Sequence, residues 1–188
     1  MRGSVGAMAP PRSALVVVDM INNYDHPDAE KLTRSVEKSL PNMVRVVERA
    51  AEEDVVTIYV NDSFGAWTSN RDDLVRSAME GEHASLIEPI RPAPDTLFVV
   101  KARHSIFYET PLEYILRQEE VERIVLVGQV TEQCVLYSAL DGYIRHFQVA
   151  VPADATAHIH ENLAEAALEM MRANMDAEIT AADDVSLS

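Results

Sequence analysis

The chain has 188 residues, of which 47% are hydrophobic and 25% charged, as is typical of one globular domain with a sizeable core. Its formal net charge of −15 argues against nucleic acid or an anionic membrane surface as a partner. One cysteine cannot form an internal disulfide, and no apolar run reaches the roughly 18 residues of a membrane span, so we expect a protein of the reducing cytoplasm.

Residues 1–12 are expected to form a flexible N-terminal arm that is not a secretory signal, because the segment has no long apolar stretch and contains Pro10 and Pro11. A single domain is expected over residues 13–188. Six short apolar segments in that domain predict strands, at 14–19, 55–61, 96–101, 123–128, 148–151 and, with a weaker pattern, 177–180. Their Val/Ile/Leu runs are continuous rather than alternating, which favours strands that are covered on both faces.

Helical periodicity occupies the segments between these strands. It predicts helices over 31–53, 71–81, 110–118, 135–145 and 160–174, with a break in the first where Pro41 starts a second segment at Asn42. The alternation of strand and helix predicts an α/β fold in which a doubly wound, mostly parallel sheet lies between two helix layers.

Polar residues follow several of the predicted strands. Asp19 ends the first strand, Lys101 ends the third, and Cys134 lies in the loop after the fourth. Parallel sheets bind ligands beyond the carboxyl ends of their strands, so the three side chains meet if their strands cluster where the strand order reverses.

Together these three groups have the chemistry of an acyl-transfer site. Asp19 is placed to take the thiol proton, while Lys101 and the following helix N-terminus are expected to bring the pKa of Cys134 below the ordinary value of about 8.5. Backbone N–H groups in the turn from Val130 to Cys134 are candidates for binding an oxyanion. The pattern predicts amide hydrolysis through a thioester.

Three segments then carry a family resemblance: residues 14–24 (ALVVVDMINNY), 100–112 (VKARHSIFYETPL) and 127–135 (VGQVTEQCV). In this order they resemble the isochorismatase-like cysteine hydrolases. That family includes nicotinamidases, N-carbamoylsarcosine amidohydrolases, ureidoacrylate hydrolases and isochorismatases. The resemblance implies a three-layer α/β/α fold with a six-stranded sheet, and a homo-oligomer, either a dimer or a tetramer.

The resemblance also implies roles for individual residues. Cys134 would be the nucleophile, Asp19 the general base and acid, and Lys101 their electrostatic partner. A non-proline cis peptide bond would join Gln129 to Val130, and the N–H groups of Val130 and Cys134 would form the oxyanion hole. The substrate pocket is expected to include four further side chains, Tyr24, Trp67, Phe107 and Thr131.

The sequence departs from the family pattern at the usual metal site. Nicotinamidases carry Asp-x-His after the second strand, whereas here Asp62 is followed by Ser63 and Phe64. A lone carboxylate is a poor zinc site, so we expect no metal and no nicotinamidase activity. The phosphate-binding glycine loops of dinucleotide and P-loop proteins are also missing from the sequence, so we expect no cofactor.

These observations predict a cofactor-free hydrolase of a small amide or ureide. A competing hypothesis is vinyl-ether hydrolysis of the isochorismatase type, in which Asp19 acts as an acid and no nucleophile is needed. Two non-hydrolytic hypotheses are a catalytically silent, oligomeric binding protein of the same fold and a flavodoxin-like cofactor binder. In the silent protein, the thiol of Cys134 would titrate near its ordinary pKa.

Overall fold

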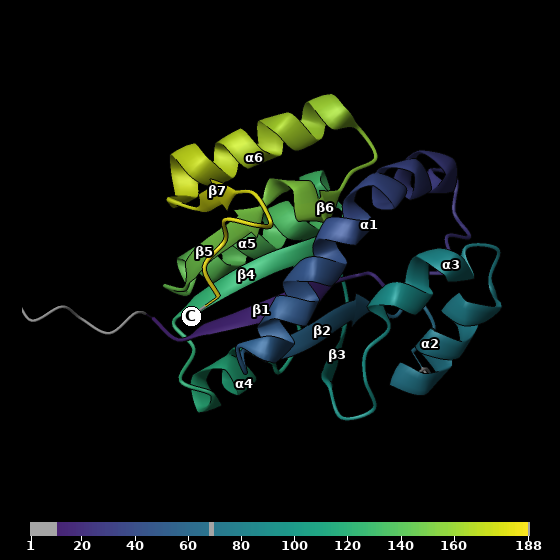
Figure 1. Ribbon diagram of the computed structural model, residues 1–188, viewed down its shortest axis with the longest axis horizontal. Helices are drawn as coiled ribbons and strands as arrows, with labels where there is room; N and C mark the ends of the chain where they lie inside the picture. The colour runs from purple at the N-terminus through teal and green to yellow at the C-terminus, as the bar shows by residue number, and fades with distance from the viewer. Residues whose placement is uncertain (1–10, 68–69, 188) are drawn as a thin grey trace, which may run out of the picture.

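The computed structural model describes residues 11–67 and 70–187, so residues 1–10 of the predicted arm lie outside the described residues. Within this part of the chain a parallel sheet has the strand order β3-β2-β1-β4-β5-β7, with β6 beside β4 (Figure 1). Its strands are β1 (Ser13–Val18), β2 (Val56–Asp62), β3 (Leu97–Lys101), β4 (Arg123–Gln129), β5 (Gln148–Pro152), β6 (Thr156–Ala157) and β7 (Glu178–Thr180).

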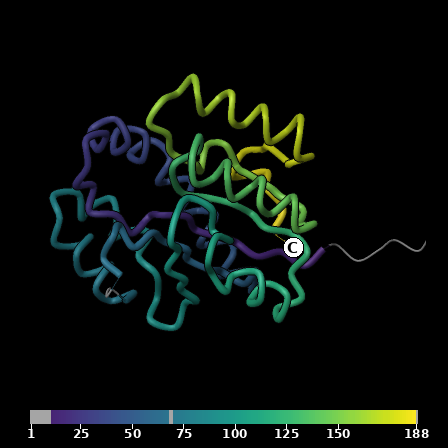
Figure 2. The backbone as a smooth tube through the Cα atoms, turned by 180° about the vertical axis from the view of Figure 1, so that it is seen from behind, coloured from purple at the N-terminus to yellow at the C-terminus, as the bar shows by residue number. Residues whose placement is uncertain are grey.

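Helices cover both faces of this sheet. In β1, Leu15 and Val17 pack into a core shared with α1, whereas Ala14, Val16 and Val18 pack into a second core shared with α4, α5 and α6. The helices are α1 (Ala29–Glu52), α2 (Arg71–Glu80), α3 (Ala84–Ile87), η1 (Glu88–Ile90), α4 (Leu112–Gln118), η2 (Thr131–Val135), α5 (Leu136–Ile144), η3 (Ala153–Ala155) and α6 (Glu161–Met175). Figure 1 shows α1 across one face, and Figure 2 shows the opposite face from behind.

The predicted α/β/α fold is confirmed, and each predicted strand lies within one residue of an observed one at both ends. The structure adds β6, whose two residues are too few to show a periodic pattern. The short segments α3 and η1 escaped prediction for the same reason. None of the helices in the described residues has both the length and the apolar character needed to cross a membrane.

The predicted break at Pro41 is wrong, because α1 continues through this residue. Proline has no N–H to donate to the carbonyl of Glu37, four residues earlier in the chain. Both residues are exposed on the solvent side of the helix, where water can bind that carbonyl. The buried face of α1 keeps its packing, so the helix tolerates the proline.

Gly128 brings the carboxyl ends of β4 and β1 unusually close together. It pairs with Val18 in the sheet and has a φ of +116°, and an added Cβ would lie 2.2 Å from the carbonyl oxygen of Val18. Only glycine fits this approach. The residues that follow these two positions, Asp19 and Gln129, are thereby brought to the same edge of the sheet.

Candidate active site

The three side chains predicted from strand ends do meet. Lys101 places its Nζ 3.0 Å from Oδ2 of Asp19 and 3.7 Å from Sγ of Cys134, so one ammonium contacts both the carboxylate and the thiol. The strand of Lys101 is not next to that of Asp19, because β2 lies between β3 and β1. The long lysine side chain spans this gap, and its exposed fraction is 0%.

A fourth charged residue belongs to the same cluster. Asp62 ends β2, is paired in register with Lys101, and places its Oδ2 3.4 Å from the lysine Nζ. Its backbone N–H donates to Oδ1 of Asp19 at 2.7 Å. The sequence pattern places Asp62 at the end of the second predicted strand and considers it as a metal ligand, but does not include it in the cluster of Asp19, Lys101 and Cys134.

Amide side chains hold the segment that follows Asp19. Nε2 of Gln129 donates to the Asp19 carbonyl oxygen at 2.7 Å, and Oε1 of Gln129 accepts from the hydroxyl of Tyr24 at 3.4 Å. Asn61 bonds both the N–H and the carbonyl of Ile21, each at 2.9 Å. The left-handed φ values of Asp19 (54°) and Tyr24 (57°) give this segment the sharp bends that these bonds fix.

The backbone at Cys134 is irregular. The peptide bond between Gln129 and Val130 is cis, and the Val130 carbonyl accepts from the N–H groups of Gln133 and Val135, at 3.0 and 3.1 Å. Thr131–Val135 forms the π-helical turn η2 before α5 begins at Leu136. The helical segment therefore starts four residues earlier than the 135–145 prediction, and Cys134 lies inside it.

The electrostatics of the cluster favour a neutral thiol. Burial raises the pKa of Cys134 and the Asp19 carboxylate raises it further, while Lys101 and the Val130 backbone lower it without reversing the direction. Burial also raises the pKa of Asp19, against the lowering effect of Lys101. Burial lowers the pKa of Lys101, but Asp19, Cys134 and Asp62 together outweigh it, so the net direction is upward.

The lowered thiol pKa predicted from the helix N-terminus is therefore corrected. We expect the alkylation rate of Cys134 by iodoacetamide to reach half its maximum at a pH above the ordinary thiol value of about 8.5. Cys134 is the only cysteine, so the same chain in denaturant supplies the reference curve. A folded-state midpoint at or below that reference would contradict the raised pKa.

Two of the four side chains that are expected to contact substrate, Phe107 and Thr131, make contacts within the protein instead. Phe107 is buried in the core and stacks on Phe147 with ring centroids 5.8 Å apart, because its ring completes the packing around α4 and β5. The hydroxyl of Thr131 lies 3.0 Å from both the hydroxyl of Thr156 and the carbonyl of Ala157, so it joins η2 to β6. Trp67 is 68% exposed on the loop after β2.

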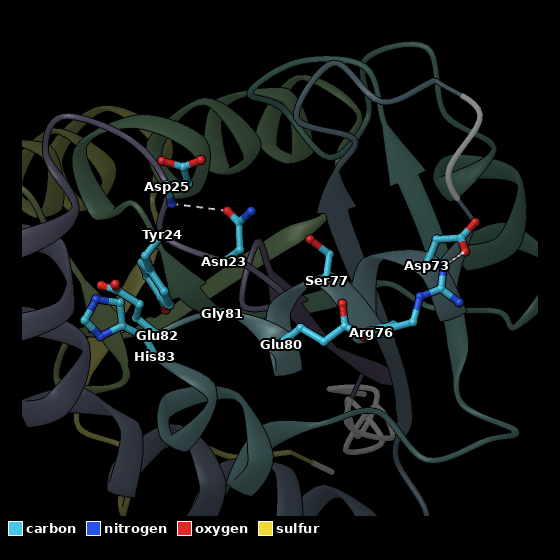
Figure 3. A pocket seen from close by; sticks show the side chains of 10 residues that line it. All are labelled: Asn23, Tyr24, Asp25, Asp73, Arg76, Ser77, Glu80, Gly81, Glu82 and His83. Carbon is cyan, nitrogen blue, oxygen red and sulfur yellow. Dashed lines mark hydrogen bonds and ion pairs between the residues drawn. The ribbon is translucent and has the colours of Figure 1, made fainter.

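Tyr24 borders the cavity drawn in Figure 3, whose volume is about 720 Å³. Burial raises the pKa of its hydroxyl to about 12, so the group stays protonated as the donor to Gln129. The ring of Tyr24 meets His83 edge-on at 5.6 Å. The cavity walls carry more acids than bases: Asp25, Asp73, Glu80 and Glu82 against Arg76 and His83.

A second cavity, of about 390 Å³, lies beside His104. Nδ1 of His104 is 4.0 Å from Sγ of Cys134, and its ring meets Tyr137 edge-on at 5.5 Å. Tyr137 is one helical turn after Cys134, a spacing that could have identified it as a neighbour of the site. The remaining lining residues are Arg103, Ser105, Tyr108 and Asp141.

Glu132, which the sequence patterns did not single out, anchors α6 to the turn that carries Cys134. This buried side chain accepts hydrogen bonds from the N–H groups of Ile159 and His160, at 3.0 and 2.7 Å.

The described residues contain no group of three or more His, Cys, Asp or Glu side chains arranged to hold a metal ion. The expectation of a metal-free site stays a prediction.

Comparison with known proteins gives consistent results. Residues 13–184 match the family model described as the isochorismatase domain. The uncharacterized isochorismatase family protein YaaI of Bacillus subtilis (strain 168) is 32% identical over 178 residues, which cover 95% of this chain and 98% of that protein. Ureidoacrylate amidohydrolase RutB of Methylorubrum extorquens is 38% identical over 72 residues, which cover 38% of this chain and 29% of that protein. The crystal structure of N-carbamoylsarcosine amidase from Thermoplasma acidophilum has a TM-score of 0.71 and 27% identity, covering 93% of this chain and 99% of that one.

Proposed function

Because the chain belongs to the isochorismatase family of hydrolases, we propose that it cleaves a C–N bond of a small amide or ureide through a thioester on Cys134. One observation carries the proposal: the single thiol lies 3.7 Å from the Lys101 ammonium, which is itself paired with the Asp19 carboxylate at 3.0 Å. Vinyl-ether hydrolysis needs an acid but no nucleophile, so it leaves this thiol unexplained. The names of two relatives, an amidase and an amidohydrolase, support C–N hydrolysis.

In the proposed reaction, ionised Asp19 takes the proton of Cys134 while the sulfur attacks the carbonyl carbon. Proton transfer accompanies the attack, because the raised pKa keeps the free thiol protonated. The electron pair of the C=O bond moves to oxygen, which the N–H groups of Val130 and Cys134 are proposed to bind. The C–N bond then breaks, and the amine leaves with the proton from Asp19.

The second half of the reaction restores the enzyme. Asp19 takes a proton from a water molecule as the water oxygen attacks the thioester carbon. The C–S bond breaks, the acid product leaves, and the proton returns to Cys134. Lys101 keeps its charge throughout and stabilises the ionised form of Asp19 and the developing negative charge on sulfur.

The charges around the site favour a neutral substrate over a dicarboxylate such as isochorismate. Asp19 and Asp62 face a single ammonium, that of Lys101, so the cluster already carries excess negative charge. Bringing two more carboxylates into this field would cost Coulomb energy, whereas an uncharged amide avoids that cost.

A covalent intermediate tests this function. We expect that mixing the protein with a panel of small amides and ureides, followed by rapid acid quenching, gives an acyl adduct on the peptide that contains Cys134. Mass spectrometry identifies the adduct, and ammonia or amine release measures turnover. Hydrolysis of isochorismate alone, with no adduct at any quench time, would contradict the proposal and favour acid catalysis by Asp19.

The proposal also includes a homo-oligomer, either a dimer or a tetramer, in the cytoplasm. Support for self-association comes from α5, which exposes Tyr137, Leu140, Tyr143 and Ile144 with exposed fractions between 42% and 58%. A large apolar surface of this kind is typical of a protein interface. The cytoplasmic location is supported by the single free cysteine.

A further inference from the structure

The ammonium of Lys101 has three N–H donors and three protein acceptors. These are Oδ2 of Asp19 at 3.0 Å, Oδ2 of Asp62 at 3.4 Å and Sγ of Cys134 at 3.7 Å. Because the lysine side chain is fully buried, water does not compete for these donors. The three acceptors therefore share one positive charge. A stronger interaction of the ammonium with one acceptor weakens its electrostatic stabilisation of the other two.

Asp62 is oriented for this contact by its own turn. Its Oδ1 accepts the backbone N–H of Phe64 at 2.8 Å, which directs Oδ2 toward Lys101. The side chain of Asp62 is 26% exposed, against 8% for Asp19, so the carboxylate of Asp62 is the better hydrated of the two. Asp62 therefore adds a second carboxylate beside the single lysine ammonium.

We propose that Asp62 is a positioning residue that draws the Lys101 ammonium away from the sulfur and so keeps Cys134 in its neutral thiol form in the free enzyme. With Asp19 and Asp62 ionised, one positive charge already faces two negative charges, and a thiolate would add a third. A neutral thiol is less readily oxidised or alkylated than a thiolate, so the nucleophile is protected between turnovers.

Two other titratable groups face the thiol in the described structure and are kept constant in the test. Asp19, which directly follows β1, raises the pKa of Cys134, because its negative charge opposes thiolate formation directly. His104, in the loop after β3, places Nδ1 4.0 Å from Sγ. Asp62 acts through Lys101, so neither of these residues needs to change.

The test is the alkylation rate of Cys134 in Asp62→Asn. Asparagine keeps the oxygen that accepts the Phe64 N–H but removes the charge, so Lys101 turns more fully to Asp19 and the sulfur. We expect the pH midpoint of alkylation to fall by about one unit, which raises the rate at a fixed pH below both midpoints about tenfold. The same midpoint is measured without reagent access from the ultraviolet absorbance of the thiolate, with Cys134→Ser as the blank.

Three further variants distinguish the loss of the Asp62 charge from loosened packing around residue 62. Asp62→Glu alters the packing but keeps the charge, so its alkylation rate should stay near that of the wild type. Asp183→Asn removes a carboxylate from an exposed ion pair with Arg45 and controls for net charge. Asp62→Ser, whose hydroxyl can accept the same turn N–H, replaces Asp62→Asn if that variant fails to fold.

An unchanged midpoint in Asp62→Asn, or an equal rate increase in Asp62→Asn and Asp62→Glu, would overturn the inference. Its meaning for catalysis rests on the proposed function, in which Cys134 is the nucleophile. The alkylation experiment needs no turnover. The role of Asp62 and the proposed hydrolase activity can therefore be contradicted independently of each other. A shifted midpoint in a protein that hydrolyses no amide would support the role of Asp62 and contradict the proposed hydrolase.

Discussion

Replacing Cys134 by alanine is expected to lower the rate of amide hydrolysis by a factor of about 10⁴ to 10⁶. Without the sulfur no thioester forms, and water must attack the amide directly. The N–H groups that are proposed to bind the oxyanion belong to the backbone, so some acceleration over the uncatalysed reaction should remain. Turnover is measured as amine release at saturating substrate, with far-ultraviolet circular dichroism as the check on folding.

Cys134→Ser is the matched control for this prediction. Its hydroxyl has nearly the size of the thiol but is a weaker acid, so it should be as stable as the wild type and nearly as inactive as the alanine variant. Full activity in Cys134→Ala would rule out the thioester. That result would leave Asp19 as the acid of an isochorismatase-type reaction.

Replacing Lys101 by methionine is expected to reduce both stability and activity. The substitution keeps most of the side-chain volume but leaves the buried Asp19 carboxylate without its cation. Removing one partner of a buried ion pair typically costs about 3–5 kcal/mol in the free energy of unfolding. Urea denaturation measures this loss, and Arg76→Met, which breaks the exposed pair with Asp73, should cost less than about 1 kcal/mol.

The pH dependence of the Lys101→Met variant follows from the same charges. Lys101 lowers the pKa of Asp19, which burial holds above its ordinary value of 3.8, so removing the lysine raises that pKa further. The stability deficit should therefore shrink as the pH falls through this raised pKa, because a protonated carboxyl needs no cation. A deficit that is equally large at every pH would show that lost packing, rather than the unpaired charge, causes it.

Local patterns were enough to find the strands and most of the helices. A buried strand of a parallel sheet is marked by its own continuous apolar run, as at 123–128, whatever the rest of the chain does. The effect of Pro41 depends on which face of α1 it occupies, and the local sequence does not show that face. That face is set by packing against the sheet, which lies far away in the sequence.

The sequence did not show which of the predicted substrate-contacting side chains are held by contacts within the protein. Phe107 lies only six residues beyond Lys101, yet its ring stacks on Phe147 from a distant turn. The hydroxyl of Thr131 is close to Cys134 in sequence, yet it is held by Thr156 and Ala157. Proximity along the chain does not decide which way a side chain points, because the partners that compete for it come from other elements.

The sequence by itself determined the fold class and the three side chains of the site, since Asp19, Lys101 and Cys134 each lie just where a recognisable strand or strand–helix junction ends. Only the tertiary structure decided their electrostatics. It enclosed Lys101, brought Asp62 to it as a second carboxylate, and buried Cys134 beside Asp19, so that the pKa of the thiol is raised where a helix N-terminus alone would lower it. Desolvation and charge pairing depend on distances through space, and those distances exist only after the strands have paired.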